Sequence, residues 1–149
     1  MAKIRIHQEM KTLMMDPPGG IQLDLARSET DMTWYVNVDG AENTIYQGEK
    51  FVLQVTFNLD YPFKPPKVVF VGEHIPCNPH VYSNGHICIS ILGEEWSPTL
   101  DITAICLSII SMLSSCTKKE WPAGDDMYVQ TVKDVDYRIF NGTYNDTKC

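Results

Sequence analysis

Apolar residues recur every three or four positions over residues 1–15, which is the spacing of one face of an α-helix. The residues on that face are Ile6, Met10, Leu13 and Met14. The segment DPPGG at residues 16–20 follows, and it ends the helix because proline cannot continue it and glycine permits a turn. The pattern therefore predicts an N-terminal helix that stops at a tight turn.

From residue 21 the apolar period changes to two, as in strands with one buried face. The alternating positions are Ile21, Leu23 and Leu25, then Met32, Trp34, Val36 and Val38, then Phe51, Leu53, Val55 and Phe57. A short apolar run, Val68–Val71, follows. Short turns separate these segments, so the simplest arrangement is an antiparallel meander of four strands.

Two later segments predict loops. YPFKPP, residues 61–66, carries three prolines and cannot be a central strand, so we expect a rigid, extended loop. Residues 72–99 follow no regular period. A loop of that length within a compact domain is usually functional.

Helical spacing returns at Asp101. The apolar face comprises Ile102, Ile105, Cys106, Ile109 and Leu113, and Leu107 and Ile110 are expected to widen it until the helix is largely buried. A last helical pattern follows Asp125 and continues to Ile139. Strands first and helices afterwards indicate an α+β domain. We expect this domain over residues 1–140, followed by a flexible polar tail over residues 141–149.

The composition narrows the class of protein. The chain has 149 residues, 44% of them hydrophobic, which suffices for one globular domain. A formal net charge of -7 argues against binding to nucleic acids and anionic membranes, which needs a basic surface. There is no secretory signal and no apolar run long enough to span a bilayer, so we expect an intracellular protein. The odd number of cysteines, five, then predicts free thiols.

The stretch NPHVYSNGHICISIL, residues 78–92, leaves four interpretations of Cys88 open. Together with Cys77, His80 and His86 it could bind zinc, although the spacing matches no known structural zinc module. It could be a protease nucleophile, although no cysteine-protease signature surrounds it. It could be a small buried residue, although the polar turn before it should place it near the surface. It could also be a thiol that carries a transferred group.

Three linked motifs favour the carrier thiol. YPFKPPKVVF, NPHVYSNGHICISIL and EEWSPTLDI occur in this order and together resemble the ubiquitin-conjugating enzymes. RIHQEM with the following DPPGG, and YQGEKFVLQVTF, are similar to that family's first helix and third strand, so the resemblance covers nearly the whole chain to about Leu113. IPCNPHVYSNGHICISIL, ICLSIISMLSSC and TYNDTKC are most similar to the W class, whose members modify protein N-termini.

The resemblance implies that Cys88 receives ubiquitin from an activating enzyme as a thioester, which an amine of the substrate then attacks. It implies no cofactor in this chain, because ATP is used by the upstream activating enzyme. It also implies a four-stranded meander flanked by helices, and a location in the cytoplasm and nucleus. Two alternatives stay open: a carrier of a different ubiquitin-like modifier, and a non-catalytic interaction domain of the same fold.

The active-site loop departs from the usual family pattern. Most members have His-Pro-Asn before the cysteine, and the asparagine supports the loop or the oxyanion. Here His80 stands in place of that asparagine, as in the W class, and is expected to take one of these two roles. Asn78 stands in place of the histidine, which differs even from the W class and leaves the packing of the loop open. Ser90 replaces one acidic residue of the family, and Glu120 corresponds to a second or is a solvated surface charge.

An active site with fewer acidic residues near the cysteine is compatible with attack by N-terminal amines. An α-amine has a pKa of about 7.7–8.0 and a lysine about 10.4, so near neutral pH the α-amine is neutral on the order of several hundred times more often. In keeping with the W-class resemblance, we expect substrates with flexible N-termini to be favoured over lysine side chains.

The resemblance also assigns binding surfaces. The residues are Phe63, Ser97, Pro98 and Thr99 for RING and U-box ligases, Lys3 and Arg5 for the activating enzyme, and Leu100, Leu107 and Ser111 for donor ubiquitin. An aromatic side chain on a rigid loop loses little entropy on binding, which suits a ligase contact at Phe63. The alternative is that Phe63 fills the core beneath its loop.

Overall fold

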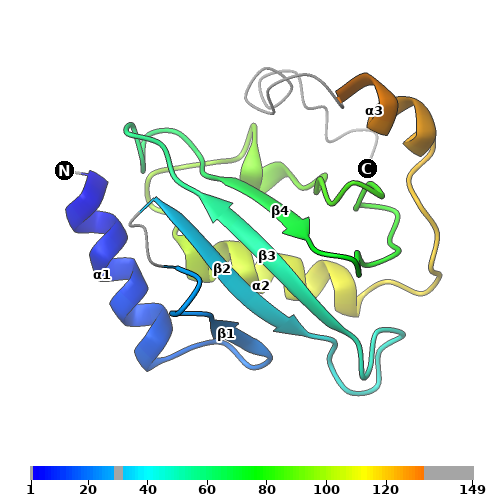
Figure 1. Cartoon of the computed structure of the whole chain (residues 1–149), viewed down its shortest axis with the longest axis horizontal. Helices are drawn as coiled ribbons and strands as arrows, with labels where there is room; N and C mark the ends of the chain where they lie inside the picture. Colours follow the sequence, from blue (N-terminus) through cyan, green and yellow to red (C-terminus); the bar gives the residue numbers. More distant parts are fainter. Residues whose placement is uncertain (1, 29–31, 133–149) are drawn as a thin grey trace.

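The computed structural model describes residues 2–28 and 32–132. Within them lie α1 (Ala2–Met15), β1 (Ile21–Leu23), β2 (Thr33–Asp39), β3 (Lys50–Thr56), β4 (Lys67–Val71), the 3-10 helix η1 (Ser90–Leu92), α2 (Ile102–Ser114) and α3 (Asp125–Val132) (Figure 1). The predicted order of a helix, four strands, a long loop and two helices is confirmed, and with it the α+β class. The predicted domain end at residue 140 and the predicted tail lie outside the described residues.

The sheet is antiparallel, with its strands in the order β1-β2-β3-β4. In its long central pair, β2 and β3, Trp34 opposes Val55 and Val36 opposes Leu53. Burial alternates along both strands, as the period of two in the sequence requires. The predicted meander is therefore confirmed.

β1 is shorter than the predicted alternation. After Leu23 the backbone turns, because the carbonyl oxygen of Asp24 accepts hydrogen bonds from the N–H and the hydroxyl of Ser28, at 3.1 and 2.7 Å. Leu25 is consequently 49% exposed and does not continue the buried face. The predicted strand is wrong beyond Leu23.

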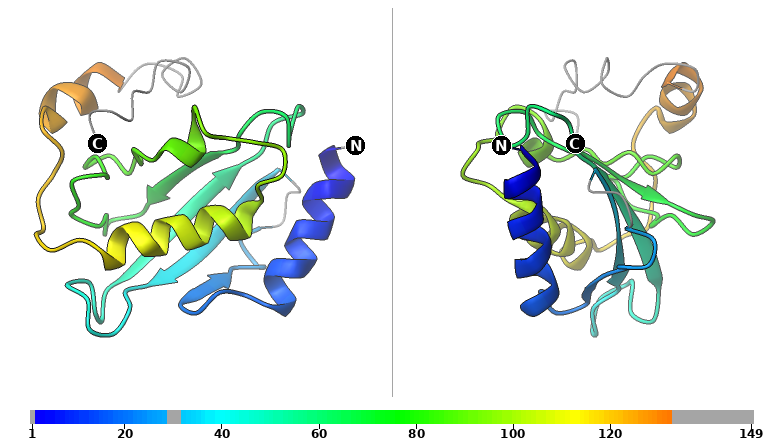
Figure 2. Two further views of the ribbon diagram at one scale, coloured as in Figure 1. Left: turned by 180° about the vertical axis from the view of Figure 1, so that it is seen from behind. Right: turned by 60° about the vertical axis from the view of Figure 1, so that its left-hand side comes forward.

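The hydrophobic core lies between the sheet and α2, which covers one face of the sheet (Figure 2, left). The buried residues of α2 are those of the predicted apolar face: Ile102, Ile105, Cys106, Ile109 and Leu113. Leu107 is 52% exposed, so the prediction that it widens the buried face is wrong. Two residues beyond Ile105 a helix has turned by about 200°, so this side chain points away from the sheet. Within the described ranges, no helix has both the length and the apolar character needed to cross a membrane.

Glu9 on α1 joins three segments that are distant in sequence. One of its carboxylate oxygens accepts a hydrogen bond from the N–H of Ile102 at 2.8 Å. Asp101 accepts one from the N–H of Ala104, also at 2.8 Å, so both carboxylates supply acceptors that the first turn of α2 lacks. The other oxygen of Glu9 accepts a bond from the Tyr61 hydroxyl at 2.6 Å. The Pro-rich loop and the start of α2 are thereby held against α1.

Candidate active site

The polar turn before Cys88 is anchored on β4. The N–H of Gly85 donates to the carbonyl oxygen of Tyr82 at 2.8 Å, which closes the turn. The N–H of Phe70 in β4 donates to the carbonyl oxygen of Gly85 at 2.8 Å. Gly85 has a φ of +94°, and a side chain there would collide with the carbonyl oxygen of Phe70. Glycine is therefore required for this turn to lie against the sheet.

Cys88 lies directly after this turn and is 3% exposed. The expectation that the turn brings it near the surface is therefore wrong. Val81 forms a bridge with Ile87, and the N–H of Cys88 donates to the carbonyl oxygen of His80 at 2.8 Å. Attack by this sulfur on a partner therefore requires a conformation in which the sulfur is more exposed.

A chain of hydrogen bonds leads from the core to this cysteine through Asn78. The side-chain amide of Asn78 donates to the hydroxyl of Tyr46 at 3.0 Å. Its carbonyl oxygen accepts from the N–H of His80 at 2.7 Å, and the carbonyl oxygen of His80 accepts from Cys88. Asn78 is 0% exposed, so these bonds are shielded from water. The sequence left open how the loop packs around Asn78. The side-chain amide of Asn78 fills the position at which the resemblance implies a histidine, and it holds the loop.

Tyr46 is the inner end of this chain. It is 0% exposed, and its hydroxyl donates to the carbonyl oxygen of Cys77 at 2.6 Å. The sulfur of Cys116, two residues beyond the end of α2, lies 3.5 Å from the same hydroxyl. Burial, followed by the interaction with Cys116, raises the pKa of Tyr46 well above its usual range. The hydroxyl therefore stays protonated and remains a donor.

His80 and Glu120, the two expected helpers of Cys88, line one cavity of about 200 Å³. Its walls are Pro79, His80, Met112, Ser115, Cys116, Thr117, Lys118 and Glu120. The ring atom Nδ1 of His80 is buried and has no hydrogen-bond partner among the described residues. Glu120 is exposed and lies 3.5 Å from Lys118. The backbone of His80, and not its Nδ1, therefore holds the loop.

His86 does not supply a positive charge beside Cys88. Burial, followed by the charge of Lys67, lowers the pKa of His86 to about 4, so the ring is neutral near pH 7. Its Nδ1 lies 3.0 Å from the hydroxyl of Tyr128. A neutral imidazole cannot lower the pKa of a nearby thiol by charge attraction.

α3 packs against the outer side of the same turn. The sequence did not predict this contact. The carboxylate of Asp125 accepts hydrogen bonds from the N–H and the hydroxyl of Ser83, at 2.8 and 2.7 Å. The ring of Tyr128 stacks on Tyr82 with 3.7 Å between centroids. Nothing in the helical pattern after Asp125 identifies these partners, since Ser83 lies 42 residues away from Asp125.

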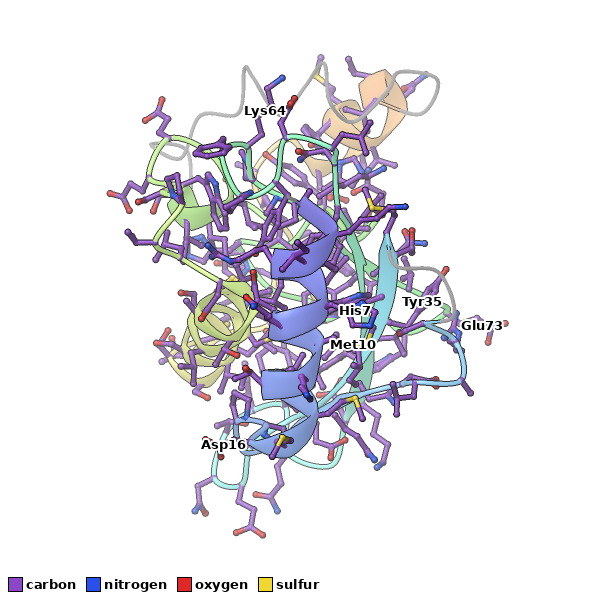
Figure 3. The ribbon with its side chains drawn as sticks, turned by 90° about the vertical axis from the view of Figure 1, so that its left-hand side faces the viewer. His7, Met10, Asp16, Tyr35, Lys64 and Glu73 are labelled. Carbon is purple, nitrogen blue, oxygen red and sulfur yellow. The ribbon has the colours of Figure 1, made fainter. Side chains whose placement is uncertain are left out.

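Phe63 is 72% exposed, so the alternative that it fills the core is wrong. Its loop is tied to the loop before α2, because the indole N–H of Trp96 donates to the carbonyl oxygen of Pro62 at 2.8 Å. In that second loop the hydroxyls of Ser97 and Thr99 lie 2.9 Å apart. Figure 3 shows Lys64, next to Phe63, near the N-terminal end of α1, with Asp16 at the other end.

Arg5, expected to face the activating enzyme, also has an internal role. Its guanidinium donates to the carbonyl oxygens of Pro98 and Leu100, at 3.0 and 2.7 Å, and to Glu9 at 2.7 Å. It therefore braces the loop that carries the expected ligase residues. Lys3 is exposed on the same helix.

Two of the residues expected to contact donor ubiquitin lie together. Leu107 and Ser111 are exposed and one turn apart on α2. Leu100 is half-buried in the loop before the helix. The exposure of Leu107 contradicts the predicted burial but suits a contact with a partner.

The described part of the chain contains no set of side chains that could bind zinc as the sequence suggested. No group of three or more histidine, cysteine or acidic side chains there could hold a metal ion.

A family model described as "Ubiquitin-conjugating enzyme" matches residues 5–145. The chain is 50% identical over 128 residues to "Probable ubiquitin-conjugating enzyme E2 W-A" of Danio rerio, with 85% of each chain covered. It is 48% identical over 128 residues to "Ubiquitin-conjugating enzyme E2 W" of Caenorhabditis elegans, covering 85% of this chain and 84% of that protein.

Solved structures give the same similarity. A crystal structure of a ubiquitin-conjugating enzyme E2 from Agrocybe aegerita superposes with a TM-score of 0.85 and 43% identity. The match covers 90% of this chain and 96% of that one. The fold is thus similar over nearly the whole length.

Proposed function

The chain belongs to the ubiquitin-conjugating enzyme family, with its closest similarity to the W class, and we propose that Cys88 is the residue that carries ubiquitin. The thiol of Cys88 replaces the thiol of the activating enzyme at the ubiquitin C-terminal carbonyl, which gives a thioester. An amine of the substrate then replaces Cys88, so that an amide forms and the thiol is released. The observation that carries this proposal is the bond from the N–H of Cys88 to His80, within the loop that Asn78 and Tyr46 hold.

His80 is proposed to support the negative charge that develops on the thioester oxygen. Such a charge needs a hydrogen-bond donor, and a neutral imidazole N–H can supply one. Since Asn78 already holds the loop through the backbone N–H of His80, the imidazole ring is not needed for that purpose. Glu120 lines the same cavity as His80, which supports a place for it near the incoming amine.

The finer proposal is that the enzyme favours α-amines of flexible N-termini over lysine side chains. It is supported by the similarity to two relatives named E2 W. The lower pKa of an α-amine, about 7.7–8.0 against about 10.4 for lysine, supplies part of the selectivity near neutral pH. Positioning must supply the rest, because lysines outnumber N-termini on most substrates.

The experiment offers the isolated thioester a peptide with a free N-terminus and one lysine, then the same peptide acetylated at its N-terminus. Mass spectrometry locates the new bond. We expect modification of the α-amine and a large loss of rate on acetylation. Equal rates for the two peptides, with the bond on lysine, would contradict the preference and leave an ordinary lysine-directed enzyme.

The proposed partners follow from the surfaces described above. Ligases of the RING and U-box classes would bind Phe63 with Ser97, Pro98 and Thr99, and the activating enzyme would bind Lys3 and Arg5. Donor ubiquitin would lie on Leu107 and Ser111 of α2, next to Leu100. The proposal includes no cofactor in this chain and a location in the cytoplasm and nucleus.

A further inference from the structure

Two hydrogen bonds join Ser90 and Glu95, shortly after Cys88 in the chain. The hydroxyl of Ser90 donates to the carboxylate of Glu95 at 2.6 Å. The N–H of Glu95 donates in turn to the carbonyl oxygen of Ser90 at 3.0 Å. The chain returns on itself because η1 ends at Gly93, whose N–H also donates to Ser90, at 2.9 Å. The Ser90 hydroxyl thereby binds one oxygen of the Glu95 carboxylate, and the Ser90 carbonyl oxygen binds the backbone of Glu95.

This pair lies close to Cys88. Ser90 follows Cys88 by two residues, and an extended chain spans at most about 3.3–3.6 Å per residue, so the two Cα atoms lie within about 7 Å. The next residues fix the segment, because Leu92 is 2% exposed and Ile91 packs against the core. η1 also contacts α2, beside which it lies (Figure 2, left). The Glu95 carboxylate, in the turn after η1, is therefore bound to a residue that lies two positions from Cys88.

The Glu95 carboxylate has fewer hydrogen-bond and ion-pair partners than other carboxylates around the loop. Asp125 is bound through both oxygens by Ser83, and Glu49 is bound by Lys119 at 2.6 Å and His74 at 2.8 Å. Glu95 forms no ion pair in the part of the chain that the structure describes, and its contact with Ser90 uses one of its two oxygens. The second oxygen is open to a ligand, and Glu95 is exposed.

We propose that Glu95, positioned by Ser90, is a catalytic residue that accepts a proton from the attacking amine. The inference rests on the proposed thioester transfer. When a neutral amine bonds to the thioester carbon, its nitrogen becomes positively charged, and a carboxylate in reach stabilises that charge. One N–H proton passes to Glu95, the carbon–sulfur bond breaks, and the Cys88 thiolate leaves. The proton then passes through water to the thiolate, so one amine and one thioester give one amide and one thiol.

The test measures discharge of the isolated ubiquitin thioester to a lysine-free peptide with a free N-terminus. Starting from the purified thioester removes any difference in charging. The peptide concentration is varied to separate kcat from KM. Glu95→Gln is compared with Glu94→Gln, the matched control, because Glu94 is the neighbouring exposed carboxylate. Thermal midpoints establish that the variants are folded.

We expect Glu95→Gln to lower kcat by about 10-fold or more with little change in KM, since general-base groups typically contribute about 100- to 10,000-fold and this one is exposed. Ser90→Ala should lower kcat by about 2- to 10-fold, the loss expected for one positioning hydrogen bond. Adding Ser90→Asp to Glu95→Gln should restore most of the rate, because it returns a carboxylate to the same place. Glu94→Gln should behave as wild type.

The proposal is overturned if Glu95→Gln matches Glu94→Gln, if only KM changes, or if the added Ser90→Asp restores nothing in a folded protein. Should Glu95→Gln fail to fold, Ser90→Ala decides in its place, because it keeps the carboxylate and removes only its anchor. Failure of the wild-type protein to form a thioester would instead overturn the proposed function, so the two outcomes are distinguishable.

Discussion

Asn78, which stands where the resemblance implies a histidine, is accommodated in the loop by a hydrogen bond to Tyr46. Its amide has a donor and an acceptor, and it uses both: the donor meets Tyr46 and the acceptor meets the backbone of His80. A loop that carries a reactive cysteine must be rigid without regular secondary structure, and buried side-chain bonds supply that rigidity. The fold therefore depends on Tyr46 as much as on Asn78.

We expect Tyr46→Phe to lower the free energy of unfolding by about 1–3 kcal/mol, because it leaves buried polar groups of Cys77 and Asn78 unpaired. Tyr35→Phe is the matched control, since Tyr35 is only half-buried and its hydroxyl meets the side chain of Gln54. Urea denaturation measures both. An equal loss in the two variants would mean that the Tyr46 hydroxyl has no special role.

His86 predicts a pH dependence of stability. Its pKa is about 4 in the folded protein, below the usual value of 6.5, so the unfolded chain binds the proton more readily. Stability is fully present above about pH 6.5 and is lost as the pH falls toward 4, by roughly 1–2 kcal/mol after allowance for solvent screening. Replacing His86 with Gln should flatten the stability curve over this interval. A variant as steep as wild type would assign the loss to other groups, such as Glu49.

At the scale of elements, periodicity predicted the helices and strands because one buried face requires it. α2 begins at the expected residue, since Asp101 is a good N-cap, and the meander follows from short turns. β1 failed because a side-chain-assisted turn at Asp24 outweighed the apolar alternation. The bonds from Glu9 to Ile102 and from Asp125 to Ser83 join distant residues, and no local pattern encodes them.

The same limit holds within the candidate site. Cys88 was identified because its flanking motif is specific, yet its burial was not, because exposure depends on how the loop pairs with residues 80 and 81. Phe63 was placed at the surface by its rigid loop, and the structure agrees. The hydrogen bond between Ser90 and Glu95 was not predicted, because the sequence does not indicate which acceptor a serine hydroxyl binds.

The contact between α3 and the turn before Cys88 gives a prediction for dynamics. Asp125→Ala removes the acceptor for the N–H of Ser83, so the amide of Ser83 should exchange with solvent faster, by about 10-fold or more if the bond contributes about 1.4 kcal/mol. Asp126→Ala is the control, because Asp126 is exposed beside it. Amide exchange measured by NMR compares the two. Unchanged exchange at Ser83 would mean that α3 does not hold the turn.

At the scale of the whole molecule, the exposed Phe63 and the buried Cys88 belong to different regions of one rigid frame. Glu9, Arg5 and Trp96 tie the two loops of the ligase surface to α1 and to the start of α2. α2 then runs from those loops to the cavity beside His80.

Phe63→Ala should lower ligase-stimulated discharge by about 10-fold or more, the loss typical of an aromatic contact at a binding hot spot, with little change in stability. The side chain is 72% exposed, so little core packing is lost. Leu59→Ala, which removes an even more exposed apolar side chain, should retain stimulation. A large drop in the thermal midpoint of Phe63→Ala would identify a folding residue instead.

Cys88 is proposed to carry ubiquitin as a thioester. The direct measurement incubates the protein with ubiquitin, activating enzyme and ATP, and resolves the products on gels with and without reductant. We expect an adduct that reductant removes, that is absent in Cys88→Ala, and that persists in Cys116→Ala, which alters a half-exposed cysteine near the same loop. A reductant-sensitive adduct that survives in Cys88→Ala, or no adduct in the wild-type protein, would contradict it.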